Sequence, residues 1–140
     1  MNEQVLLHKR QRQFVGRVFG AHFDWLHDQK VRFSLADPSK ALRMVLDYVM
    51  QDLTEAELFV GSPAGSYPQE STDDERVFVL DVSHVQWLES ATSKRGFLSA
   101  STLVDYVIDV VAKVDPCLIF EIERSHKRAR DTAVRFSIKS

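Results

Sequence analysis

The stretch His22-Phe23-Asp24-Trp25-Leu26 returns 62 positions later as His84-Val85-Gln86-Trp87-Leu88, and this near-repeat decides the fold class. The match continues without a gap as far as Asp52 and Val114, and seven of the 32 pairs from position 21 onward are identical. The identical pairs are His22/His84, Trp25/Trp87, Leu26/Leu88, Ser39/Ser101, Val45/Val107, Asp47/Asp109 and Val49/Val111. The chain's two tryptophans therefore fall on each other. Such self-similarity indicates two copies of one supersecondary unit.

The second copy predicts a strand followed by two helices. Residues Arg76–Val82 are rich in β-branched and aromatic side chains and have strand length. Ser83 is the expected N-cap of a helix that ends at Gly96, where a left-handed residue is favoured. Ser99 is the expected N-cap of the next helix, which Pro116 stops. The apolar stripe of that helix is Leu103, Val104, Val107, Ile108, Val111 and Val114.

The first copy has the same pattern. It predicts a strand over Gln13–Phe19, a helix through Trp25, and a second helix that starts at Asp37-Pro38, an acidic cap followed by proline. Asp37 aligns with Ser99, so both copies place an N-cap at the same point. In a competing frame Val31–Leu35, which resembles Val134–Ile138, is itself a strand, but the 62-residue frame is preferred because it explains both tryptophans and both caps.

These elements predict one domain over residues 1–140, with repeats at about 13–53 and 76–115. A linker rich in glycine, serine and proline covers about 61–75. The C-terminal extension, 116–140, holds two further candidate strands, Leu118–Glu123 and Ala133–Lys139.

The composition is that of a globular protein, with 44% hydrophobic and 27% charged residues. No apolar run has the length of a membrane span, and the first residues lack the features of a signal peptide. Cys117 is the single cysteine, so no disulfide framework is expected. We therefore expect a cytoplasmic protein without a membrane partner.

The net charge of −2 hides strong segregation. Residues 54–75 hold six acids and no base, whereas residues 124–140 hold six bases and one acid. A second basic cluster is formed by Lys9, Arg10, Arg12 and Arg17. Basic ends on a neutral body are typical of proteins with an anionic partner, and solvated termini are an equally good interpretation.

A short strand, a helix that ends at a glycine turn and a second capped helix resemble the ribbon-helix-helix family of DNA-binding proteins. The stretch Gly96–Leu103 is similar to the turn of that family into its second helix. The resemblance covers roughly 13–53 and 76–115. It implies a mostly α-helical fold with a short β-ribbon, in which two copies on one chain form a single-chain pseudodimer, here with additional C-terminal strands.

The resemblance also implies a DNA-binding surface. The ribbon of the family enters the major groove, which gives Gln13 and Arg17 the role of reading bases. The outward positions of the second strand are then Val77, Val79 and Asp81, which are poor readers. The family holds a phosphate at the start of each second helix, a role that suits Ser99 and Ser101 but not Asp37-Pro38. Phosphate contacts along the DNA backbone are expected from Lys9, Arg10, Arg12, Lys127, Arg128 and Arg130.

Several single residues have both a functional and a structural interpretation, and the structural one is favoured for each. His22 and His84 lack a set of companion ligands for zinc, so they are interpreted as packed or capping side chains. Trp25 and Trp87 are interpreted as core residues, and Asp47 and Asp109 as helix surface. Neither a cofactor site, a metal site nor an enzymatic constellation is expected.

Two functions are consistent with these sequence features. The first is a DNA-binding protein, a transcriptional regulator that binds double-stranded DNA through the ribbon and the basic termini. The second is a non-enzymatic structural or protein–protein interaction module that has lost DNA reading. Such a module docks a protein partner, or a second copy, through its apolar strands.

Overall fold

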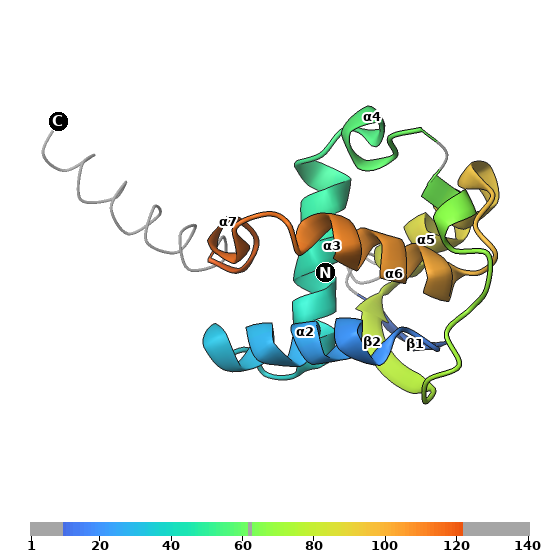
Figure 1. The fold of residues 1–140 in the computed structure, drawn as a ribbon. Helices are drawn as coiled ribbons and strands as arrows, with labels where there is room; N and C mark the ends of the chain where they lie inside the picture. Colours follow the sequence, from blue (N-terminus) through green and yellow to red (C-terminus); the bar gives the residue numbers. More distant parts are fainter. Residues whose placement is uncertain (1–9, 62, 122–140) are drawn as a thin grey trace, which may run out of the picture.

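The computed structural model describes residues 10–61 and 63–121, and within them two short strands lie at one edge of a group of helices (Figure 1). The order strand, helix, helix occurs twice, and a short helix follows each time. The first set is β1 (Gln11–Gly16), α2 (Gly20–Arg32), α3 (Pro38–Gln51) and α4 (Glu55–Leu58). A 3-10 turn, η1 (Pro63–Ser66), precedes the second set, which is β2 (Arg76–Asp81), α5 (Val82–Arg95), α6 (Ala100–Val111) and α7 (Pro116–Phe120).

The two strands form one antiparallel ribbon. Val15 pairs with Val77, Gln13 with Val79, and Gln11 with Asp81. Side chains alternate across a strand, so these six residues share the outer face of the ribbon. The inner face carries Phe14, Phe78 and Leu80, of which the last two are fully buried. The ribbon is thus anchored by its inner face and open on its outer face.

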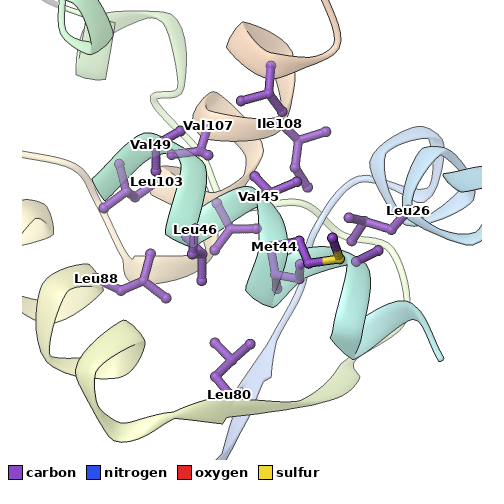
Figure 2. Close-up of a cluster of buried hydrophobic side chains, with 14 of the residues drawn as sticks. Leu26, Met44, Val45, Leu46, Val49, Leu80, Leu88, Leu103, Val107 and Ile108 are labelled. Carbon is purple, nitrogen blue, oxygen red and sulfur yellow. The ribbon is translucent and has the colours of Figure 1, made fainter. Parts of the chain in front are cut away.

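The core lies where α3 and α6 meet beneath the ribbon. Figure 2 shows Val45, Leu46 and Val49 of α3 beside Val107 and Ile108 of α6. Leu26, Leu80 and Leu88 bring α2, β2 and α5 into the same cluster. The predicted apolar stripe of α6 is confirmed, since Leu103, Val104, Val107, Ile108 and Val111 are each 0% exposed. The β-branched residues of α6 lower its helix propensity, so this packing stabilises the helix.

The predicted caps of the second helices are confirmed. The Asp37 carboxylate accepts a hydrogen bond from the Lys40 amide at 2.8 Å, and the Ser99 hydroxyl accepts one from the Thr102 amide at 3.3 Å. Gly96 ends α5 with φ of 74°, in the left-handed region as predicted. Ser34, 62 positions earlier, follows α2 with φ of 54° and is the one non-glycine residue at positive φ among those described.

Each short helix carries an aromatic ring to a tryptophan of the other set. Phe59, which follows α4, stacks on Trp87 of α5 with ring centroids 6.4 Å apart. Phe120 of α7 lies 5.7 Å from the Trp25 ring of α2. Both tryptophans are partly buried against the hydrophobic core, as their core interpretation predicts.

Two of the predicted boundaries near the ribbon are wrong. The first strand runs over Gln11–Gly16 and not over Gln13–Phe19. The reason is that the Arg17 and Phe19 amides donate to the side chains of Ser101 and Asp105 rather than to a strand. Ser83 is not an N-cap, because α5 begins earlier, at Val82, with Asp81 in the cap position.

The strand predicted over Leu118–Glu123 is also wrong. Residues Pro116–Phe120 form helix α7, whose first amides are capped by the Asp115 carboxylate, 3.0 Å from the Cys117 amide. Pro116 begins this helix rather than stopping α6, which already ends at Val111. The alternative strand over Val31–Leu35 is excluded, since Val31 lies in α2 and a turn follows. The strand predicted over Ala133–Lys139 lies outside the described residues.

Removal of core volume from either second helix is expected to destabilise the protein strongly. Leu46→Ala and Ile108→Ala each lower the free energy of unfolding by about 2–5 kcal/mol, because both side chains are fully buried and leave a cavity. Urea denaturation measures the loss. Leu98→Ala is the matched control, since Leu98 is 62% exposed. A loss below about 1 kcal/mol at both core positions contradicts this packing.

The left-handed positions give a second stability prediction. Ser34→Gly raises the free energy of unfolding by up to about 1 kcal/mol, because glycine accepts positive φ without a Cβ penalty. Gly96→Ser lowers it by about 1 kcal/mol for the same reason. Thermal and urea melts of both variants test the pair. Opposite signs are expected, and a destabilised Ser34→Gly variant contradicts the strain at this turn.

Candidate nucleic-acid interface

The outer face of the ribbon holds Gln13, one of the two predicted base-reading residues, whereas Arg17 follows the end of β1. Gln11 and Gln13 are exposed there, and Val15 and Val77 are 49% and 57% exposed. Val79 and Asp81 are intermediate in burial. The predicted outward positions of β2 are therefore confirmed, and β1 adds Gln11, which no sequence pattern singles out.

Basic side chains flank one end of this face. Arg10 and Arg12 are exposed, and the Arg10 carbonyl accepts a hydrogen bond from the Val82 amide at 2.8 Å, which continues the strand pairing. Strand alternation places Arg12 on the opposite side of β1 from Gln11 and Gln13. Both arginines therefore border the ribbon rather than project from the middle of its outer face.

Acidic side chains flank the other end. The Arg17 guanidinium lies 3.6 Å from the Glu75 carboxylate and donates to the Asp73 carbonyl at 3.2 Å. The Asp73 carboxylate accepts from the Gly20 amide, 2.7 Å away, at the start of α2. Asp74 lies exposed between these two acids. Arg17, predicted to read bases, thus already has acidic and carbonyl partners within the chain.

The two serines predicted to hold phosphate have internal partners. The Ser101 hydroxyl is buried and accepts a hydrogen bond from the Arg17 amide at 3.1 Å. Ser39, its counterpart in α3, accepts from the Val79 amide at 2.9 Å in the same manner. The Ser99 hydroxyl caps α6 and lies 3.4 Å from the Glu70 carboxylate. Four further predicted DNA-contacting residues, Lys9, Lys127, Arg128 and Arg130, lie outside the described residues.

The His22 ring contacts two carboxylates of α6, those of Asp105 and Asp109. Its Nδ1 is 2.6 Å from Asp105, and its Nε2 is 2.8 Å from Asp109. A carboxylate only accepts hydrogen bonds, so the ring satisfies both when each nitrogen carries a proton. Burial lowers the pKa of His22, but the hydrogen bonds and charges of Asp105 and Asp109 outweigh it, and the net pKa lies above the usual 6.5.

His84, the counterpart of His22, has different partners. Its Nε2 lies 2.6 Å from the Asp47 carboxylate of α3, and its Nδ1 accepts from the Asp81 amide at 3.3 Å. The two ring nitrogens of His84 thus have one carboxylate and one backbone amide within hydrogen-bond distance, where those of His22 have two carboxylates. The difference has a sequence cause, because the position equivalent to Asp105 is Arg43 in the first set. Arg43 instead donates to the Val79 carbonyl at 2.5 Å.

The histidine–aspartate pairs are not predicted by any local pattern, although each of their residues stands out in the repeat. His22 and Asp109 belong to different copies, as do His84 and Asp47, so neither pair is visible as a local spacing. The sequence signal for these pairs is the near-repeat itself, because both members of each pair stand at positions where the two copies are identical. In the structure, each pair joins a first helix of one set to the second helix of the other: His22 of α2 to Asp109 of α6, and His84 of α5 to Asp47 of α3.

In comparisons with protein-family models, curated proteins and solved structures, no match to this chain was found. Among the residues that the structure describes, no group of three or more His, Cys, Asp or Glu side chains is placed to hold a metal ion. None of the helices within that part of the chain combines the length and the apolar character needed to cross a bilayer.

The raised pKa of His22 predicts a pH dependence of stability. The protonated ring stabilises the folded state fully below its unfolded pKa of about 6.5 and loses this contribution as pH rises through the higher folded value. His22→Gln is expected to remove stability on the order of 1 kcal/mol near pH 6, and less above the folded pKa.

Urea denaturation between pH 5.5 and 9 measures this effect. His84→Gln is the matched control, because His84 has one carboxylate within hydrogen-bond distance rather than two. Equal pH dependence in wild type and His22→Gln excludes the charged pairing of His22 with Asp105 and Asp109.

Proposed function

We propose that the chain is a DNA-binding protein, a transcriptional regulator in which two ribbon-helix-helix units form a pseudodimer. The observation that carries the proposal is the register of the ribbon. Val15 and Val77, 62 positions apart, pair directly with each other. Equivalent residues of an antiparallel pair face each other where a twofold axis crosses it, and this is the ribbon of such a pseudodimer.

Reciprocal contacts across that axis support the proposal. Ser39 binds the Val79 amide, and Ser101 binds the Arg17 amide, with each donor and acceptor 62 positions from its counterpart. The pairs His84–Asp47 and His22–Asp109 have the same relation. In an isologous interface, residue i contacts residue j and j contacts i. The contacts of this chain follow that rule over the ribbon, the helix starts and the helix faces.

The exposed outer face of the ribbon supports DNA as the partner. A two-stranded ribbon fits the major groove, and glutamine amides are suited to base edges. Gln11 and Gln13 are exposed on that face, and Arg10 and Arg12 lie beside them for phosphate contact. The helices behind the ribbon hold it without covering this face.

A second candidate function rests on the apolar centre of the same face. Val15 and Val77 are about half exposed, and Asp73, Asp74 and Glu75 place negative charge at one end of the ribbon. An exposed apolar centre with an acidic border suits a protein partner better than a phosphate backbone. A protein-docking module is therefore the alternative.

Binding to random-sequence duplex at two salt concentrations tests the DNA proposal. Removal of one side chain that binds a phosphate is expected to flatten the slope of log affinity against log salt by about 0.9. Arg10→Ala and Arg12→Ala are each expected to flatten the slope and to weaken binding to all duplexes about equally.

The matched control is Arg32→Ala, an exposed arginine at the end of α2, away from the ribbon. It is expected to change the slope little. Absence of binding by the intact chain at low salt removes the DNA proposal and leaves the protein-docking module.

A further inference from the structure

We infer that the ribbon reads DNA from one half only, so that its preferred duplex site is one asymmetric element and not an inverted repeat. The inference rests on the proposed function and adds a prediction about the symmetry of the DNA site. It comes from a comparison of the two sides of the Val15–Val77 pair: four pairs of the ribbon lie on the side of Gln13 and Gln11, and only the Gly16–Arg76 pair lies on the other.

The outer face of the first half carries two amide side chains. Its outward residues are Gln13, paired with Val79, and Gln11, paired with Asp81. Both glutamines are exposed. A glutamine amide donates and accepts at once, which matches the N6 and N7 atoms of adenine in the major groove.

The second half is the segment that leads into β2, beyond the last pair of the ribbon, and it carries acids where the first half carries amides. The position 62 residues after Gln13 is Glu75, and the position 62 residues after Gln11 is Asp73. Glu75 lies 3.6 Å from the Arg17 guanidinium, and the Asp73 carboxylate accepts from the Gly20 amide. These hydrogen-bonding side chains of the second half are therefore engaged with one another or with the backbone.

Charge divides the ribbon in the same direction. Arg10 and Arg12 are exposed beside the amide half, whereas Asp73, Asp74 and Glu75 are exposed beside the other half. A DNA phosphate is attracted at the first end and repelled at the second. Exposed positive charge thus lies beside the amide half, where the Asp81 side chain is partly buried, whereas the Arg17 guanidinium on the other side lies 3.6 Å from the Glu75 carboxylate.

Selection of bound sequences from a random duplex library with the full chain tests the inference. The expected result is one asymmetric motif that contains adenine at the positions read by the amide half. Recovery of an inverted repeat overturns the inference but leaves the proposed function standing. Failure to recover any duplex, together with no binding at low salt, overturns the proposed function itself.

The variants Gln13→Ala and Glu75→Gln test the roles given to the two halves, with Gln51→Ala as the control. Gln13→Ala is expected to reduce the preference for the selected motif over random duplex by about 5- to 150-fold, the range for one bidentate base contact. Gln51→Ala, at the exposed last residue of α3, is the matched control and is expected to leave the preference unchanged. Equal preference in wild type and Gln13→Ala overturns the assignment of the amide half.

Glu75→Gln tests whether the acid at this position prevents the second half from reading bases. It removes the acid beside Arg17 and places an amide at the position equivalent to Gln13, on a residue exposed enough to tolerate the change. The selected motif is expected to extend across the centre toward an inverted repeat. A motif of unchanged length and asymmetry contradicts the role given to Glu75.

Discussion

The pairing of β1 with β2 is the constraint on which the rest of this structure depends. Two strands that lie far apart along the chain must meet in one register, and closing such a loop costs conformational entropy. A two-stranded ribbon is marginal by itself, so its stability must come from burial of its inner face. Phe78 and Leu80 provide that burial against the helical core, while Ser39 and Ser101 satisfy the amides of Val79 and Arg17.

The same arrangement buries the carboxylate of Asp105, which costs free energy of folding. Its side chain is fully buried, and it accepts from the Phe19 amide and from His22. A buried charge without a partner is strongly destabilising, so Asp105 requires the imidazolium of His22. The equivalent position in the first set is Arg43, which donates to the Val79 carbonyl of β2. The two sets thus keep one architecture while their polar groups differ.

Sequence patterns predict those parts of the fold that are set by interactions between residues close together in the sequence. The caps at Asp37 and Ser99, the left-handed turn at Gly96 and the apolar face of α6 depend on residues within one or two helical turns. The first strand ends at Gly16 rather than at Phe19, because the Arg17 and Phe19 amides donate to the Ser101 and Asp105 side chains of α6. The helix Pro116–Phe120 has the composition of a strand, and its apolar run is too short for periodicity to decide.

The candidate site shows the same division between local and long-range control. The family resemblance places Val77, Val79 and Asp81 on the outer face, and their greater exposure than that of Phe78 and Leu80 agrees; alternation by itself fixes only that the three residues share a face. The partners of Arg17 and Ser101 are not predictable in this way, since they come from the acidic segment before β2 and from the opposite half of the chain. Sequence patterns therefore locate the surface but not which of its polar groups are already engaged.

A duplication within one chain changes what such a surface is able to recognise. In a homodimer, any change in the ribbon appears in both halves, so the surface stays symmetric and suits a symmetric site. Two copies on one chain are free to differ wherever the shared core does not constrain them. The identical pairs here include those with a packing or pairing role, such as Val45/Val107 in the core and Ser39/Ser101 at the strands. In the proposed pseudodimer, Glu75 and Asp73 are the counterparts of Gln13 and Gln11, and these two acids lie before β2 whereas the two amides lie in β1, so the two halves differ in both chemistry and backbone.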